Sequence, residues 1–138
     1  MLSILTYTDS HFDGVAALWG EAFPNDSPWN LASAAISEKL RIQPNLLMVA
    51  VESDRVVGSV MAGYDGHRGW ISRVAVLKSE RLKGVGQALV RKAEKRLSDL
   101  GCVKINLQVV TSNAGVLGFY RSLGYEVEER VSMSKRIA

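Results

Sequence analysis

Three consecutive stretches with the pattern of β-strands constrain the fold of this chain more than any other feature. Apolar residues dominate Leu46 to Val51 and Arg55 to Tyr64, and a short polar turn separates the two stretches. A second turn, Asp65 to Gly69, then leads into a third stretch from Trp70 to Val76. Turns this short join antiparallel neighbours, because a parallel connection needs about a dozen residues or more. The middle of the chain is therefore predicted to form an antiparallel meander.

The period of the apolar residues changes after Gly86. Apolar side chains recur there at helical spacing up to Leu100, so we predict an amphipathic helix that ends at Gly101. The stretch from Lys104 to Val110 alternates and is rich in Val, Ile and Leu, which predicts another strand. A strand, helix and strand in so compact a run favour parallel pairing of the two strands.

Shorter patterns predict the remaining elements. They are a strand over Leu2–Tyr7, helices over Phe12–Ala22, Leu31–Arg41 and Ala114–Leu123, and one or two short closing strands between Tyr125 and Ile137. Together the elements predict an α/β (α+β) fold in which helices cover a mixed, mostly antiparallel sheet. A chain of 138 residues without repeats or linkers suits one domain over residues 1–138.

Composition excludes several classes of protein. No apolar run approaches the roughly 20 residues that span a bilayer, and the N-terminus lacks a charged leader, so we expect neither a membrane partner nor a secretion signal. Cys102 is the only cysteine, which excludes a disulfide framework and fits the reducing cytoplasm. We interpret Cys102 as a small packing residue rather than a nucleophile.

The net charge of +3 is a mild excess. Nucleic-acid binding would need a denser basic stripe with aromatic residues beside it, so we expect no nucleic acid partner. A basic interaction domain stays an alternative, and its binding should fall steeply with salt. Such a domain would bind through the basic side chains of one helix, which we interpret instead as a solvated face: Arg91, Lys92, Lys95 and Arg96.

A glycine-containing segment, Arg81 to Gly86, lies between the third strand and the amphipathic helix. Glycine lets backbone amides approach a ligand, and the first amides of a helix are unpaired at its positive end, so a diphosphate fits there. Arg81 and Lys83 add positive charge, as does Lys78 nearby. Because Gln87 follows Gly86, the segment is not a Walker loop. A plain strand-to-helix turn is the alternative interpretation.

The motifs that follow this loop occur in an order that resembles a known family. The helix is followed by a strand, then Asn113, then Phe119-Tyr120 and Gly124-Tyr125. In this order the series closely resembles the GNAT superfamily of acetyltransferases, and the resemblance covers essentially the whole chain. The resemblance implies acetyl-CoA as cosubstrate, no metal, and a primary amine as acceptor. It also implies a central parallel strand pair that splays apart to admit the coenzyme, and family members are often homodimers.

Carried over residue by residue, the resemblance assigns roles to the site. The loop would hold the pyrophosphate, Val74 to Val76 would pair with the pantetheine arm, and Asn113 would contact the arm from the other side. Tyr120 would be the catalytic acid that gives a proton to the departing thiolate. The implied coenzyme-binding residues are Val74, Ala75, Val76, Arg81, Leu82, Lys83, Gly84, Val85, Gly86, Gln87, Asn113 and Tyr120.

The sequence departs from the family pattern at several places. Lys78 stands where a proline is frequent, Leu82 where a glycine is frequent and Val116 where an alanine is frequent, and none of these changes removes a required contact. More seriously, the strand Trp70 to Val76 lacks the glutamate that many members use as general base. We further hypothesise that the amide of Val74 or a neighbour stabilises the oxyanion of the reaction. A water chain is one candidate for the missing base; the candidate side chains, each also interpretable as a surface residue, are Glu21, Asp26, Asp65 and His67.

Several alternatives stay open at the level of sequence. Trp29 and Tyr64 either line an acceptor pocket or pack in the core and loops. The chain is either an enzyme or a non-catalytic module that senses acyl-CoA. The acceptor is a small-molecule amine or a protein amine, with the acyl-transfer chemistry the same in both cases.

Overall fold

A computed structural model describes residues 1–138 apart from the side chains of Ser112 and Ala114. The chain forms two compact units, which are described separately. The N-terminal unit is Met1–Gln108, and the C-terminal unit is Val109–Ala138.

The N-terminal unit is built on a five-stranded sheet with the order β1-β2-β3-β4-β5. The strands are β1 (Ser3–Thr6), β2 (Leu47–Glu52), β3 (Arg55–Tyr64), β4 (Gly69–Val76) and β5 (Ile105–Asn106). The first four strands pair antiparallel with their neighbours, and β5 pairs parallel to β4. The predicted meander and the mixed, mostly antiparallel sheet are therefore confirmed.

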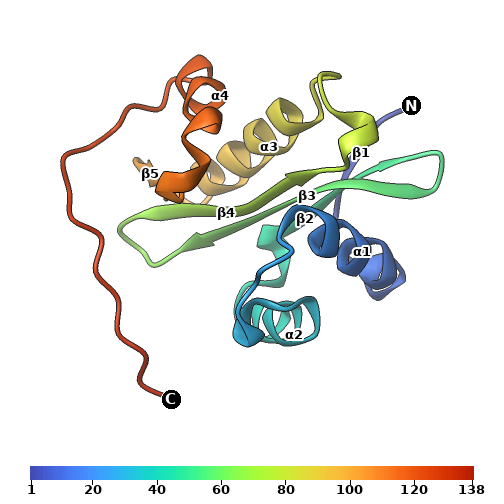
Figure 1. The fold of residues 1–138 in the computed structure, drawn as a ribbon, viewed down its shortest axis with the longest axis horizontal. Helices are drawn as coiled ribbons and strands as arrows, with labels where there is room; N and C mark the ends of the chain where they lie inside the picture. Colours follow the sequence, from blue (N-terminus) through green and yellow to red (C-terminus); the bar gives the residue numbers. More distant parts are fainter. The chain divides into compact units, whose positions relative to one another are not determined.

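Helices cover both faces of this sheet (Figure 1). Helices α1 (Phe12–Ala22) and α2 (Ala32–Ile42) lie on one face, and α3 (Val85–Asp99) lies on the other. A Cβ atom added to Gly58 of β3 would come within 2.8 Å of Leu89 Cδ1, so the close packing of α3 requires glycine there. None of the helices in the described part of the chain combines the length and apolar character of a membrane span.

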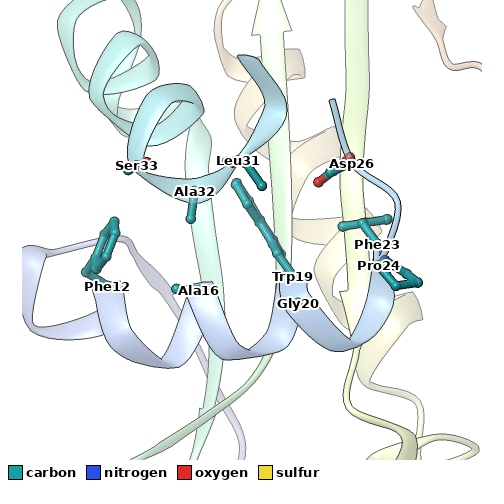
Figure 2. Close-up of a pocket in the computed structure, with 10 residues that line it drawn as sticks. All are labelled: Phe12, Ala16, Trp19, Gly20, Phe23, Pro24, Asp26, Leu31, Ala32 and Ser33. Carbon is teal, nitrogen blue, oxygen red and sulfur yellow. The ribbon is translucent and has the colours of Figure 1, made fainter. Parts of the chain in front are cut away.

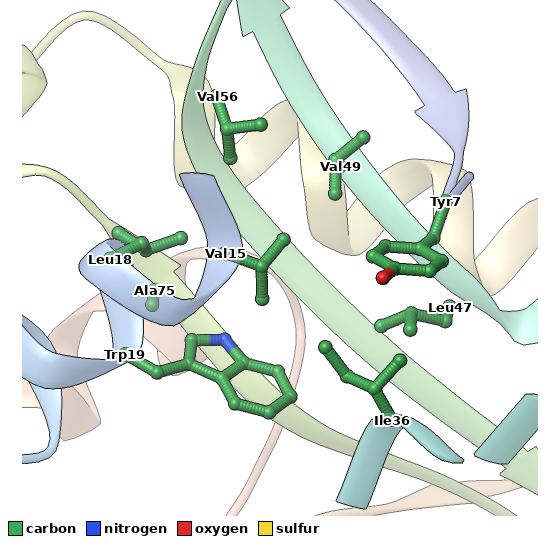
Figure 3. Packing of buried hydrophobic residues seen from close by; sticks show 9 residues of the cluster. All are labelled: Tyr7, Val15, Leu18, Trp19, Ile36, Leu47, Val49, Val56 and Ala75. Carbon is green, nitrogen blue, oxygen red and sulfur yellow. The ribbon is translucent and has the colours of Figure 1, made fainter. Parts of the chain in front are cut away.

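The core on the side of α1 and α2 explains the apolar sequence of the central strands. Its residues are Tyr7, Val15, Leu18, Trp19, Ile36, Leu47, Val49, Val56 and Ala75 (Figure 3). In β3 both kinds of alternating position are buried, from Val56 through Val60. A strand that helices cover on both faces has a near-continuous apolar sequence, as β3 does.

The second strand of the parallel pair is shorter than the sequence predicts. We predicted a strand over Lys104–Val110, whereas β5 contains only Ile105 and Asn106. Its register pairs those two residues with Gly69 and Trp70 of β4. Among the described residues the rest of β4 has no β5 partner, so the two strands are paired at one end only.

The C-terminal unit contains a 3₁₀ segment, Thr111–Val116, followed by helix α4 (Leu117–Ser122). Gly124 ends this helix at φ +99°, and the amide of Tyr125 donates to the Tyr120 carbonyl at 3.0 Å. The predicted closing strands between Tyr125 and Ile137 are wrong, because residues 125–138 contain no strand. A strand needs the edge of another strand, and the C-terminal unit offers none within residues 109–124.

Candidate functional site

The loop before α3 has an unusual backbone. After β4 the chain makes a 3₁₀ turn over Lys78–Glu80, and Leu82 and Gly84 then both adopt left-handed conformations, with φ of +65° and +81°. Successive backbone amides in a turn of this kind can form a concave anion-binding nest. The positive φ also explains why glycine is frequent at the position of Leu82, since glycine alone adopts it without strain.

The first turn of α3 is open to a ligand. Gly84 is the N-cap residue, and no side chain of the described residues caps the helix there. A Cβ atom added to Gly84 would meet none of the described atoms within 4 Å. The first amides of α3 therefore lack a side-chain partner at the positive end of the helix.

A buried carboxylate, which the sequence analysis missed, organises the charges beside the loop. Glu80 is 8% exposed and lies 3.1 Å from Lys83 Nζ and 3.7 Å from Arg55 Nη2. Arg81 Nε donates to the Val76 carbonyl at 3.4 Å. Glu80 thus pairs with two basic side chains, Lys83 of the loop and Arg55. Arg55 comes from the β2–β3 hairpin, so its arrival depends on the fold rather than on local sequence.

The predicted pantetheine strand, Val74 to Val76, lies in the part of β4 beyond its pairing with β5. It leads directly into the glycine loop, so the structure brings these two predicted parts of the site together. The β3–β4 register passes from Ser59–Ala75 to Met61–Ser72, which leaves Arg73 and Val74 opposite Val60. This bulge puts Arg73 in a left-handed conformation with φ of +53°.

The Arg73 side chain is held by residues of α1 and of the loop that follows it. Its guanidinium donates two hydrogen bonds to the Asp26 carboxylate, at 2.7 and 2.9 Å. The same group lies 4.4 Å from the ring centre of Phe23 and 5.2 Å from that of Trp19, both within cation–π range. Ser59 donates to the Arg73 carbonyl at 2.9 Å. The sequence analysis identified neither Arg73 nor Ser59, although a serine inside an apolar strand is a usable signal.

A pocket of about 330 Å³ lies between α1, the loop after it and the start of α2 (Figure 2). Phe12 lies at one end of the pocket, and Phe23 and Asp26 lie at the other. The lining residues are Phe12, Ala16, Trp19, Gly20, Phe23, Pro24, Asp26, Leu31, Ala32 and Ser33. Trp29 and Tyr64, which we considered for such a pocket, lie outside this set.

The candidate bases have different environments. Glu21 accepts a hydrogen bond from the Lys78 amide at 2.9 Å, and Asp26 pairs with Arg73. Asp65 accepts from the amides of Arg68 and His67 at 2.7 Å each, and these bonds lower the pKa of its carboxyl. His67 Nε2 lies 2.8 Å from Arg68 Nη1, which can only donate. Each side chain is therefore engaged in local structure.

The basic face of α3 is largely paired within the N-terminal unit. Arg91 forms an ion pair with Glu94 at 2.8 Å, and Lys95 forms one with Asp99 at 2.6 Å. Arg96 donates to Thr6 Oγ1 and to the Asn45 carbonyl, at 2.8 and 2.6 Å. Arg91 and Lys95 are exposed, as interpreted, whereas Arg96 is half-buried and bonded to other segments of the unit.

Cys102 was expected to be a small buried residue, and in the structure it is half-buried. A Cβ atom added to Gly69 would lie 2.6 Å from Cys102 Sγ, so the thiol fills the space beside that glycine. The thiol also donates to the Lys104 carbonyl at 3.3 Å.

The last two predicted site residues belong to the C-terminal unit. Asn113 lies in the 3₁₀ segment at φ −111°, ψ 40°. Tyr120 lies on α4 between Phe119 and Tyr125, with ring centres 5.0 and 5.9 Å away in edge-to-face contacts. Burial raises the pKa of the Tyr120 phenol above its ordinary value of 10.0. The roles of both residues stay predictions.

Comparisons with known proteins agree with this geometry. The sequence pattern of the acetyltransferase (GNAT) family matches residues 12–125. An acetyltransferase of Yersinia enterocolitica is 38% identical over 136 residues, which cover 99% of this chain and 96% of that protein. An acetyltransferase of Pectobacterium atrosepticum is equally similar, at 38% identity over the same shares of both chains.

A solved structure shows the same fold. It is AAC(6')-Iy in complex with the bisubstrate analogue CoA-S-monomethyl-acetylneamine, with a TM-score of 0.82 and 19% identity over 100% of this chain and 99% of that one. The match of the family pattern over most of the chain and the identity to full-length relatives go further than the fold. This chain therefore belongs to the acetyltransferase (GNAT) family.

Proposed function

We propose that this protein transfers the acetyl group of acetyl-CoA to a primary amine, by direct attack of the amine in a ternary complex. The observation that carries the proposal is the open, left-handed loop at Leu82 and Gly84, which begins α3 without a side-chain cap. The acceptor is a small-molecule or protein amine, and the compartment that the single cysteine predicts is the cytoplasm.

The residues present fit coenzyme A. A diphosphate is a dianion, and the loop offers unpaired helix amides together with Arg81 and Lys83. Glu80 keeps Lys83 beside the loop through a 3.1 Å ion pair. The unpaired side of β4 at Val74 to Val76 would accept an extended pantetheine arm, in the manner of an added strand.

The proposed reaction consists of three bond changes. The amine nitrogen forms a bond to the thioester carbon, the carbon–sulfur bond breaks, and the thiolate takes a proton. We assign that proton to Tyr120, whose raised pKa keeps the phenol protonated at neutral pH. The Val74 amide would donate to the carbonyl oxygen as it gains negative charge. Since the carboxylates of Glu21, Asp26 and Asp65 all accept other hydrogen bonds, water is the favoured receiver of the amine proton.

Calorimetric titration with acetyl-CoA tests the binding half of the proposal. We expect Lys83→Ala to weaken binding about tenfold, the effect of roughly 1.4 kcal/mol from a lost charged contact. Lys95→Ala is the matched control, because Lys95 pairs with Asp99 on the exposed face of α3 and should leave binding unchanged. Wild-type protein that binds neither acetyl-CoA nor free coenzyme would contradict the proposal.

Release of free thiol with a panel of amines tests the catalytic half. An enzyme releases thiol in proportion to acetylated amine. A sensor module would bind acetyl-CoA with the same loop and release thiol with none of the amines, so this outcome would replace the enzyme by the alternative.

A further inference from the structure

The peptide group between Arg73 and Val74 lies in the bulge of β4, where the regular pairing with β3 is interrupted. In the register of the sheet both residues lie opposite Val60, and β5 pairs with β4 only at Gly69 and Trp70. Within the described residues Val74 therefore has no partner residue in the ladder on either side. The orientation of this peptide must be fixed by something other than strand pairing.

Two consecutive hydrogen bonds fix the orientation of this peptide, the first buried and the second partly buried. Trp19 Nε1 donates to Ser59 Oγ at 2.9 Å, and Ser59 Oγ donates to the Arg73 carbonyl at 2.9 Å. The directions follow from chemistry, because an indole nitrogen only donates and a carbonyl only accepts. Ser59 is fully buried and Trp19 is 3% exposed, so water does not compete for these groups.

The carbonyl direction determines where the next amide points. A trans peptide is planar, and its N–H lies antiparallel to its C=O. The backbone that the structure describes contains no cis peptide bond. With the Arg73 carbonyl turned toward Ser59 on β3, the Val74 N–H turns away from β3. It then faces the side of β4 where the pairing with β5 has ended.

The Arg73 side chain holds the same conformation from its other end. A left-handed φ is rarely adopted by residues with a side chain, so it persists only where the surroundings impose it. The paired hydrogen bonds to Asp26 and the contacts with Phe23 and Trp19 impose it here. Trp19 contributes to both ends, through its ring and through its nitrogen.

We propose that Ser59 is a positioning residue: its hydroxyl, oriented by Trp19, holds the Arg73 carbonyl and so aims the Val74 N–H into the gap beside β4. The inference rests on the proposed function, in which that amide meets the thioester carbonyl of acetyl-CoA. Ser59 is hydrogen-bonded through its side chain to Trp19 and to the Arg73 carbonyl, and neither partner belongs to the loop Arg81 to Gly86.

Infrared difference spectroscopy of bound acetyl-CoA, labelled with ¹³C at the acetyl carbonyl, tests the proposal without an acceptor. A hydrogen bond to a carbonyl lowers its stretching frequency, so we expect a lower frequency in the wild-type complex than in free acetyl-CoA. Ser59→Ala should lose most of that shift while its calorimetric Kd stays within about threefold of wild type, because the diphosphate loop is untouched. Ser59→Thr retains the hydroxyl and should restore most of the shift.

Val90→Ala is the matched control. Val90 is fully buried on α3, across the sheet from Trp19, so its truncation destabilises the N-terminal unit without touching Arg73. The control should keep the wild-type frequency shift. An equal loss in Val90→Ala, or an undiminished shift in Ser59→Ala, would overturn the role of Ser59 and leave the proposed function standing. Absence of acetyl-CoA binding by wild-type protein would instead overturn both.

Backbone NMR of the ligand-free protein gives a second, independent readout. The chemical shifts of Arg73 distinguish a left-handed from an extended conformation, and we expect Ser59→Ala to move them toward extended values. If Ser59→Ala fails to fold, Trp19→Phe removes the indole donor together with part of the ring beside Arg73, and should move the Arg73 shifts in the same direction. Arg73 shifts that stay at their wild-type values in the folded variants would contradict the proposal.

Discussion

The ion pair between Asp26 and Arg73 is a largely buried contact between two segments that are distant in sequence. Their side chains are only 12% and 14% exposed, and they join the loop after α1 to the bulge in β4. Removal of one partner from such a pair leaves the other charge without compensation in a site that water barely reaches. Asp26 therefore matters first for the conformation of β4.

Replacement of Asp26 by alanine should lower the free energy of unfolding by about 3 kcal/mol, because the Arg73 guanidinium is left buried and unpaired. Urea denaturation at neutral pH measures the change. Glu38→Ala is the comparison, since Glu38 pairs with Arg41 at 2.8 Å but both side chains are 68% exposed. That variant should lose about 0.5 kcal/mol or less. Equal losses in the two variants would show that the Asp26 pair does not act as a buried one.

Tyr120 allows a prediction about turnover. Tyr120→Phe removes the phenolic proton and keeps the ring contacts with Phe119 and Tyr125, so kcat should fall about a hundredfold while acetyl-CoA binding stays nearly intact. Because burial raises the pKa of the Tyr120 phenol above its ordinary value of 10.0, its ionisation should begin at a higher pH than that of an exposed tyrosine. Thiol release against pH and calorimetric titration measure the two quantities. A parallel loss of turnover and binding would argue against the acid role.

At the scale of elements, helix ends are where sequence and structure agree best. Gly101 follows α3 at φ +94°, with its amide bonded to the Ser98 carbonyl and the Cys102 amide bonded to the Leu97 carbonyl. This pair of bonds is the Schellman motif, in which a left-handed residue satisfies the last carbonyls of a helix. Gly124 ends α4 in the same way. The signal is local, so it is visible in the sequence.

Gly101→Ala should therefore cost about 1 kcal/mol of unfolding free energy, because alanine is strained at a left-handed φ. Ser98→Ala, one turn earlier on the exposed side of α3, is the matched control. It should leave stability unchanged or raise it slightly, since alanine favours the helix. Chemical denaturation of the three proteins distinguishes these outcomes, and a Gly101→Ala protein as stable as wild type would contradict the capping role.

Over the whole molecule, a feature could be predicted from the sequence when its signal is local, and not when it depends on residues far apart in the chain. The meander, the glycine loop and the acetyltransferase family were all predicted, and the family and enzyme class are confirmed. The Ser59 and Asp26 contacts with Arg73 were not, because their partners are 14 and 47 residues apart in sequence. The closing strands were predicted wrongly for the same reason. Whether residues 125–137 find the edge of another strand is not visible in their own sequence.

We predict that residues 1–138 form one domain. We expect a single cooperative thermal transition, with equal calorimetric and van't Hoff enthalpies, because a short C-terminal unit built on one six-residue helix has little core of its own. Differential scanning calorimetry measures both enthalpies. Two resolved transitions would show that Met1–Gln108 and Val109–Ala138 unfold independently.

The indole of Trp19 gives the bulge an optical reporter. Its nitrogen is hydrogen-bonded to Ser59, and a guanidinium lies 5.2 Å from its ring centre, so its emission depends on the state of Arg73. The chain has three tryptophans, and the other two, Trp29 and Trp70, are 51% and 43% exposed. A protein in which both are replaced by phenylalanine would emit from Trp19 alone. Its fluorescence would then follow the backbone of β4 in real time, in stopped-flow mixing as readily as at equilibrium.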